Sequence, residues 1–147
     1  MNSINFDKGY KTYAINEDEN NCIRINVADP NLKDKIELML RELDEYKESK
    51  SDSAVTPDVR KELDVFVKQK LNDVFGQGFS EAVFGDMNVF AITESGKFIY
   101  ETFMEAFLPI VQADIDKAVA ANKKHIADLV DSKKLDTIAA EITETSK

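Results

Sequence analysis

The chain has 147 residues, of which 43% are apolar, and a formal net charge of −9 at pH 7. This length suits one domain with its own core. The acidity argues against a nucleic-acid partner, because phosphates require a basic face, and against docking on an anionic membrane. One cysteine cannot form an intramolecular disulfide, and the N-terminus lacks a basic start followed by an apolar run. We therefore expect an intracellular protein without a signal peptide.

The N-terminal part of the chain predicts a β-hairpin with strands at roughly 10–16 and 21–28. In the second strand, apolar Ile23, Ile25 and Val27 alternate with polar residues, which is the period of a half-buried strand. The polar run between the strands is typical of a turn. Because a lone hairpin is marginal in water, its apolar face must lie on a helix or on a partner chain.

Two amphipathic helices are predicted over 30–48 and 57–75, with a polar linker between them. The pairs Asp29-Pro30 and Thr56-Pro57 are typical helix starts, because the Asp or Thr side chain caps free amides and proline suits the first turn. The apolar stripes are Leu32, Ile36, Met39, Leu43 and Tyr46 in the first helix, and Val59, Leu63, Phe66, Val67, Leu71, Val74 and Phe75 in the second.

Glycines mark the ends of two helices. Gly76 is expected to end the second helix as a left-handed cap, and Gly78 and Gly85 bracket a short helix over 80–84. Gly76 and Gly85 each follow a phenylalanine directly. We expect both to adopt positive φ, a conformation that glycine takes up without strain.

A third and mostly buried helix is predicted over 95–120 or beyond, capped by Thr93 or Ser95. Its first half is apolar nearly all round, apart from two glutamates four residues apart that form a narrow polar strip. Pro109 predicts a kink or a break at 106–109, because proline removes a backbone donor and clashes one turn back.

The predicted architecture is mainly α, with three principal helices and one N-terminal hairpin. Residues 1–9 are interpreted as a flexible arm, 10–120 as a single helical domain, and 121–147 as a helical, mobile tail. The hairpin face and the long helices offer more apolar surface than a chain of this size easily buries. We therefore expect a homo-oligomer, most simply a dimer.

No motif in the chain predicts a catalytic, metal or cofactor site. Gly76-Gln77-Gly78 lacks the third glycine of a dinucleotide loop, because Glu81 stands in its place. Cys22 and His125 are single residues of their kinds, so a zinc site would need distant carboxylates. A Cys–His nucleophilic pair is allowed by count, but Cys22 lies in a strand pattern and His125 in a Lys-rich helical tail. We predict a protein that is not an enzyme and binds no cofactor.

Two stretches resemble a family of small proteins from phages and prophages of Gram-positive bacteria. Leu71–Gly78 reads LNDVFGQG and Glu81–Phe90 reads EAVFGDMNVF. They are similar to the family's LFGxG…EAVFGDxN core, which precedes an apolar helix. Asn5–Tyr10 and the hairpin resemble the family too, so the resemblance covers roughly residues 4–112. Members often carry Thr-Cys in place of Phe79-Ser80, and a basic C-terminus where this chain ends acidic.

The resemblance implies a product of the tail-morphogenesis region, a non-enzymatic tail assembly chaperone. Such a protein binds another phage tail protein, the tape measure or the tube, in the host bacterial cytoplasm, and its retention in the virion is left open. The alternatives are a minor tail or connector component and an acidic host-directed inhibitor or mimic. The contact is expected to be apolar, made by helix stripes and the face opposite Glu101 and Glu105. Candidate protein-binding residues are Phe79, Phe84, Phe90, Tyr100, Met104 and Leu108.

Overall fold

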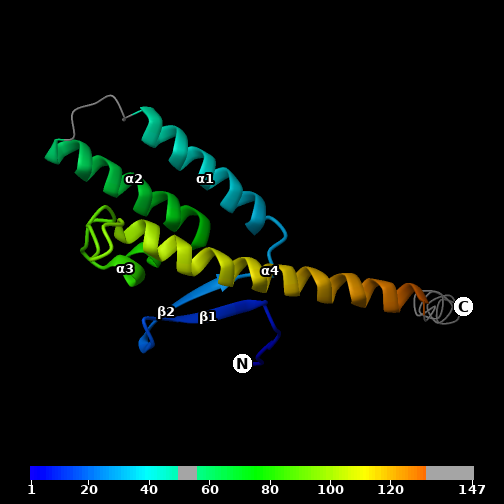
Figure 1. Ribbon diagram of the computed structural model, residues 1–147. Helices are drawn as coiled ribbons and strands as arrows, with labels where there is room; N and C mark the ends of the chain where they lie inside the picture. The colour runs from blue at the N-terminus through cyan, green and yellow to red at the C-terminus, as the bar shows by residue number, and fades with distance from the viewer. Residues whose placement is uncertain (50–55, 132–147) are drawn as a thin grey trace, which may run out of the picture.

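The computed structural model describes residues 1–49 and 56–131, which form four helices and one two-stranded hairpin (Figure 1). The predicted mainly α class with an N-terminal hairpin is confirmed. The expected linker and tail fall partly outside the described residues. The elements in chain order are β1 (Tyr10–Ile15), β2 (Asp18–Asn26), α1 (Leu32–Ser49), α2 (Pro57–Phe75), α3 (Phe79–Phe84) and α4 (Ile99–Asp131).

Strands β1 and β2 pair antiparallel, and the turn between them is shorter than predicted. Asn16 and Glu17 have positive φ, 51° and 64°, as in a two-residue type I′ turn. Strand β2 therefore resumes at Asp18 rather than at 21. The polar run that suggested a longer loop forms the start of β2. Its pairing with β1 is irregular, because the register shifts between Ala14 and Ile15 of β1.

Only the second of the two predicted helix starts is capped as expected. The Asp29 carboxylate accepts a hydrogen bond from the Asn31 amide at 2.9 Å, but both residues precede α1, which begins at Leu32 rather than at 30. The Thr56 hydroxyl accepts one from the Val59 amide at 3.2 Å, and α2 begins at Pro57 as predicted. The two helices lie side by side, joined through residues 50–55 (Figure 1).

Gly76 and Gly85 end α2 and α3 with the predicted positive φ, 115° and 58°. Their ψ angles, 154° and −132°, place neither in the left-handed helical conformation expected for Gly76. Such combinations are strained for residues with a Cβ atom. Each glycine amide still closes the last turn, donating at 2.8 Å to the carbonyl of Asn72 or Glu81.

Helix α4 begins at Ile99, so neither Thr93 nor Ser95 caps it. Thr93 instead closes a tight turn, donating its amide to the carbonyl four residues later at 2.8 Å. Near the helix start, the Glu101 carboxylate accepts a hydrogen bond from the Phe98 amide at 3.4 Å. The predicted caps were therefore wrong, because a hydrogen-bonded turn precedes the helix and delays its start to Ile99.

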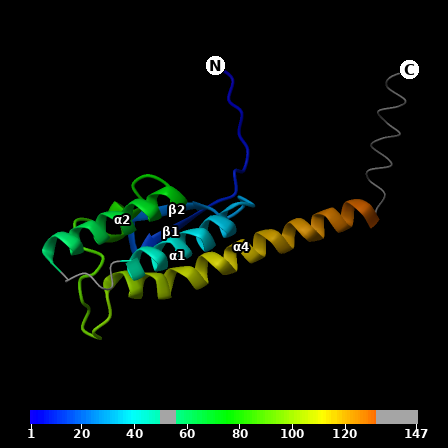
Figure 2. The ribbon, with the colours of Figure 1, turned by 90° about the horizontal axis from the view of Figure 1, so that it is seen from above.

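Helix α4 continues through Pro109, so the chain does not break there. The proline lacks the amide that would bond the carbonyl of Glu105. Both residues lie on the exposed side of the helix, so the freed carbonyl faces water and the helix loses little. As a result α4 runs on as one helix, well beyond the hairpin and the other helices (Figures 1 and 2).

Aromatic side chains hold the first half of α4 against α2 and α3. The ring of Phe107 lies 5.1 Å from that of Phe75, and the ring of Phe103 lies 5.4 Å from that of Phe84, both edge-on. Phe79 of α3 contacts both α4 rings, at 5.9 and 5.6 Å between centroids. Aromatic pairs in this geometry stabilise a core beyond the area that they bury.

The apolar face of the hairpin lies against the helices, so the chain itself supplies the predicted cover. Ile23, Ile25 and Val27 are buried. On the neighbouring strand, the Tyr13 hydroxyl donates a hydrogen bond to the Asp114 carboxylate of α4 at 2.6 Å. The hairpin and the first half of α4 are thereby fixed to one another.

Candidate protein-binding surfaces

Three of the six predicted contact residues lie in the core. Phe79, Phe84 and Met104 are no more than 7% exposed. As placed, they pack against the protein's own helices and are closed to a partner. The sequence prediction failed here because a large apolar side chain in a helical stripe looks the same whether it covers a core or a surface.

The other three predicted residues, Phe90, Tyr100 and Leu108, are half-buried and pack against the edge of the core. The ring of Phe90 lies edge-on to that of Phe98, at 5.4 Å. Burial, and then the negative charge of Asp44, raise the pKa of Tyr100 to about 12. Its phenol is therefore protonated at neutral pH, with only part of the ring open to solvent.

The face of α4 opposite the two glutamates is not free either. Phe103 and Phe107 on that face meet the rings of α2 and α3. On the polar side, the Lys97 ammonium binds both carboxylate oxygens of Glu105, at 2.9 and 3.0 Å. This hydrogen bond and the charge of Glu105 raise the pKa of Lys97. The predicted contact face thus belongs to the core.

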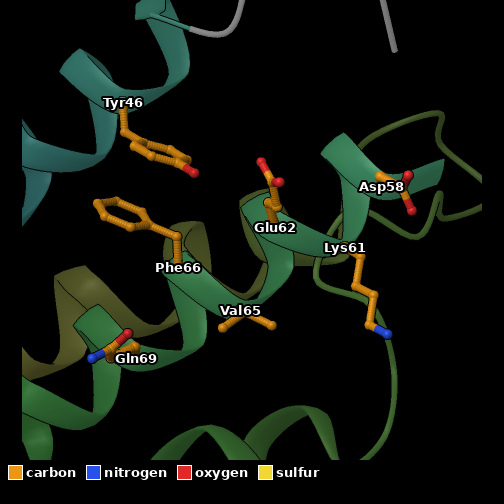
Figure 3. A pocket seen from close by; sticks show the side chains of 7 residues that line it. All are labelled: Tyr46, Asp58, Lys61, Glu62, Val65, Phe66 and Gln69. Atoms are coloured by element: carbon orange, nitrogen blue, oxygen red, sulfur yellow. The ribbon is translucent and has the colours of Figure 1, made fainter. Parts of the chain in front are cut away.

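An open hollow crosses the exposed side of α2, next to the end of α1 (Figure 3). Its volume is about 570 Å³. The rings of Tyr46 and Phe66 stack on one side of it, and Val65 points to the other, with a polar row between them (Figure 3). We call this surface the α2 shelf; it is lined by Tyr46, Asp58, Lys61, Glu62, Val65, Phe66 and Gln69.

The aromatic side of the α2 shelf is held in place by its neighbours. The Tyr46 and Phe66 rings are nearly parallel, 3.8 Å apart, and join α1 to α2. The Lys70 ammonium lies 5.4 Å from the Phe66 ring and pairs with Glu42 of α1. Val65, by contrast, is 55% exposed. The shelf therefore combines a fixed aromatic wall with an exposed apolar side chain.

A second exposed apolar surface lies on the outer segment of α4, which we define as residues 116–131. Val119, Ile126 and Val130 are 46%, 51% and 61% exposed. Ala118 and Leu129 are half-buried, and the other residues of the segment are exposed. The segment extends past the hairpin and α1 (Figures 1 and 2).

The titratable groups of the described part of the chain are dispersed. No group of three or more His, Cys, Asp or Glu residues within 1–49 and 56–131 is arranged to hold a metal ion. Cys22 is exposed on β2, and His125 lies on the outer segment of α4. None of the four described helices is both long and apolar enough to cross a membrane.

Sequence reasoning overlooked Val65 and underrated the outer segment of α4. Val65 is an apolar residue that lies outside the apolar stripe of its helix. This position was the sequence signal that could have identified it as an exposed apolar side chain. In α4, the apolar residues beyond Ile115 keep helical spacing while their density falls.

Comparisons of the chain with known protein families, curated proteins and solved structures gave no match.

Proposed function

We propose that the protein is a non-enzymatic, tail assembly chaperone-like factor that binds another phage tail protein, such as the tape measure, in the host cytoplasm. The proposal joins the resemblance of the 71–90 region to phage tail-region proteins with one structural observation. That observation is the α2 shelf, a solvent-open hollow with a rigid aromatic wall and an exposed valine.

The composition of the α2 shelf suits a contact that must later be released. Non-obligate interfaces are about as apolar as the rest of a protein surface, with aromatic residues near their centre. The shelf has this character, because Val65 and the Tyr46–Phe66 pair flank the polar row of Asp58 and Glu62. An amphipathic segment of a tail protein would place apolar side chains on both flanks and polar groups over the row. A chaperone needs such a contact, since its client leaves during assembly.

The direct test is a pull-down of tail proteins from induced prophage cells with the 147-residue chain and two variants. Val65→Asp places a charge on the exposed flank of the α2 shelf and should weaken capture of the partner by about tenfold or more. Ile110→Asp makes a comparable change on α4 at an equally exposed site, 53% against 55% for Val65, outside both candidate surfaces, and should leave capture unchanged. Equal capture by all three chains, with circular dichroism showing both variants folded, would remove the shelf from the proposal.

Salt dependence separates the proposed chaperone from the acidic host-directed mimic. A contact made mainly by apolar groups should weaken little when salt rises from about 0.1 to 0.5 M, because screening acts on exposed charges. A mimic that occupies a basic groove should lose most of its affinity over this range.

Deletion of the gene from the prophage adds a cellular test. Normal full-length tails in electron micrographs of the deletion strain would contradict a role in tail assembly.

A further inference from the structure

A second hollow lies next to the α2 shelf, between α2 and α3. We call it the α2–α3 hollow, and its volume is about 590 Å³. It is lined by the exposed side of the second half of α2 and by residues within 77–86, the stretch that contains α3. Val65 and Gln69 line both this hollow and the α2 shelf. The two hollows are therefore continuous along α2.

The α2–α3 hollow carries an excess of negative charge. Asp73 of α2, Glu81 of α3 and Asp86 after α3 line it. Within the described residues, none of these three carboxylates forms an ion pair or a side-chain hydrogen bond. Lys68 is the one basic residue among the described residues of the lining, and its ammonium lies 3.2 Å from the Asp64 carboxylate, which offsets its charge. The hollow therefore favours a positively charged ligand.

A buried hydroxyl also opens into the α2–α3 hollow. Ser80 is only 3% exposed, and its amide donates a hydrogen bond to the Asn72 side-chain oxygen at 2.8 Å, which holds the start of α3 on α2. Its hydroxyl has no hydrogen-bond partner within the described chain. Every fully enclosed polar side-chain atom of the described residues has a partner, so this hydroxyl must reach the surface of the hollow. A buried hydroxyl without a partner is costly unless a ligand binds it.

The groups that line the α2–α3 hollow select an organic cation. The carboxylates and the Ser80 hydroxyl all accept hydrogen bonds, and a lysine ammonium or an arginine guanidinium offers several N–H donors together with the positive charge. A metal ion fits less well, because no group of three or more acidic residues within 1–49 and 56–131 is arranged to hold one. The hollow is also much larger than a single ion.

The continuity of the two hollows indicates that the cation belongs to the partner bound on the α2 shelf. Asp58, Val65 and Asn72 line the hollows and recur every seven residues, so both hollows lie on one side of α2. Together they extend over about 21 Å of helix. A partner segment lying along this side would place apolar side chains against Val65 and the Tyr46–Phe66 pair. Its next side chains would then reach the acidic lining.

We propose that the client segment bound on the α2 shelf carries a lysine or arginine side chain that enters the α2–α3 hollow and binds its acidic lining. This inference rests on the proposed function and adds the chemistry of the client, an amphipathic segment with a basic residue next to its apolar side. The basic side chain makes one charged contact in a mainly apolar interface. The complex therefore remains largely resistant to salt, unlike that of a mimic in a basic groove.

A pull-down of tail proteins from induced prophage cells with two charge-reversal variants tests the proposal. Glu81→Lys reverses a charge in the lining, and Glu37→Lys makes the same change at an exposed site of α1 outside both hollows. Glu81→Lys should weaken capture by about tenfold or more, because like charges then face each other, and Glu37→Lys should leave it unchanged. The loss caused by Glu81→Lys should shrink in about 0.5 M salt, because screening weakens that repulsion.

The failure of this inference is distinguishable from the failure of the proposed function. Absence of any tail protein from the parent pull-down would overturn both. Weaker capture by Val65→Asp, together with equal capture by Glu81→Lys and Glu37→Lys, would leave the function standing and overturn the role of the α2–α3 hollow. Circular dichroism and thermal unfolding of each variant verify that a loss of capture does not reflect a loss of fold.

Ser80→Ala separates a binding role of the hydroxyl from a structural one. Since the hydroxyl has no partner within the described chain, its removal should not lower the free energy of unfolding. Capture of the tail protein should nevertheless weaken by about threefold, because one hydrogen bond to the cation is lost. Lower stability with unchanged capture would show that Ser80 serves the fold alone and would count against the proposal.

Spermidine distinguishes a client side chain from a free organic cation. Isothermal titration of the parent with spermidine should give no saturable binding, because the proposed cation is held by the client's contact with the α2 shelf. Saturable binding of spermidine that Glu81→Lys abolishes, with equal capture of the tail protein by parent and variant, would assign the hollow to a small polyamine. That result would overturn the proposal.

Discussion

The two halves of α4 make a useful comparison, because one helix carries the same apolar side into two different environments. Over its first half, Phe103 and Phe107 meet the rings of α2 and α3. Over its second half, Val119 and Ile126 meet solvent within the described chain. The first half is rich in large aromatics, whereas the second has smaller residues at coiled-coil spacing. The difference teaches that the periodicity of a stripe identifies a helix, while the size and density of its residues distinguish a core-facing stripe from an exposed one.

The largest expected effect comes from breaking the first half. Phe79→Ala removes a buried ring that contacts both Phe103 and Phe107, and should lower the free energy of unfolding by about 3–5 kcal/mol. Val119→Ala, on the outer half, should change it by less than about 0.5 kcal/mol at concentrations where the chain is monomeric. Urea denaturation measures both. Similar losses for the two variants would remove the distinction between the halves.

A smaller effect is expected at the end of α3, the helix on which the first half of α4 rests. Gly85→Ala should lower the free energy of unfolding by about 1 kcal/mol or more, because φ of 58° with ψ of −132° is strained for alanine. No atom lies within 4 Å of the added Cβ, so the loss would be conformational rather than steric. Thermal unfolding of parent and variant measures it. An unchanged melting temperature would mean that the chain relaxes freely at this position.

The link between the hairpin and the first half of α4 gives a pH-dependent prediction. Tyr13→Phe removes the hydrogen bond to Asp114 and should lower the free energy of unfolding by about 1 kcal/mol at pH 7. Burial first, then that hydrogen bond and the charge of Asp114, raise the pKa of Tyr13 above its ordinary value of 10.0. Its contribution to stability is therefore complete below pH 10 and is lost as the pH rises further.

Denaturant unfolding between pH 9 and pH 11 measures this linkage. The parent should lose stability above pH 10, and Tyr13→Phe should lose less. Some decline should remain in the variant, because the pKa of Tyr100 is also raised, to about 12. Identical pH profiles for parent and variant would show that Tyr13 does not couple the hairpin to α4.

Much of the fold was predictable because local signals agreed with tertiary packing. Thr56-Pro57 caps and starts α2 without help from distant residues, and the Asp29 turn directly precedes α1. The alternation of Ile23, Ile25 and Val27 specified the buried side of the hairpin. Errors arose where a short hydrogen-bonded turn intervened, as before Ile99, because turn geometry depends on contacts that periodicity does not encode.

The candidate surfaces were predicted less well, for a physical reason. Phe79 and Phe84 were chosen for their size and lie in the core, whereas Val65 was overlooked and is exposed. The side of a helix that the rest of the chain covers depends on how the helices pack, and the apolar character of one residue does not determine it. The exposed second half of α4 emerges only when the packing is known, because the buried residues of this helix end at Ile115.

The central claim is that the body of the chain covers only the first half of α4, and amide hydrogen exchange along the helix tests it most directly. Peptides from residues 99–115 should exchange slowly, because the apolar side of this half is buried against α2 and α3. Peptides from residues 116–131 should exchange much faster. Equally slow exchange over the two halves would contradict the account.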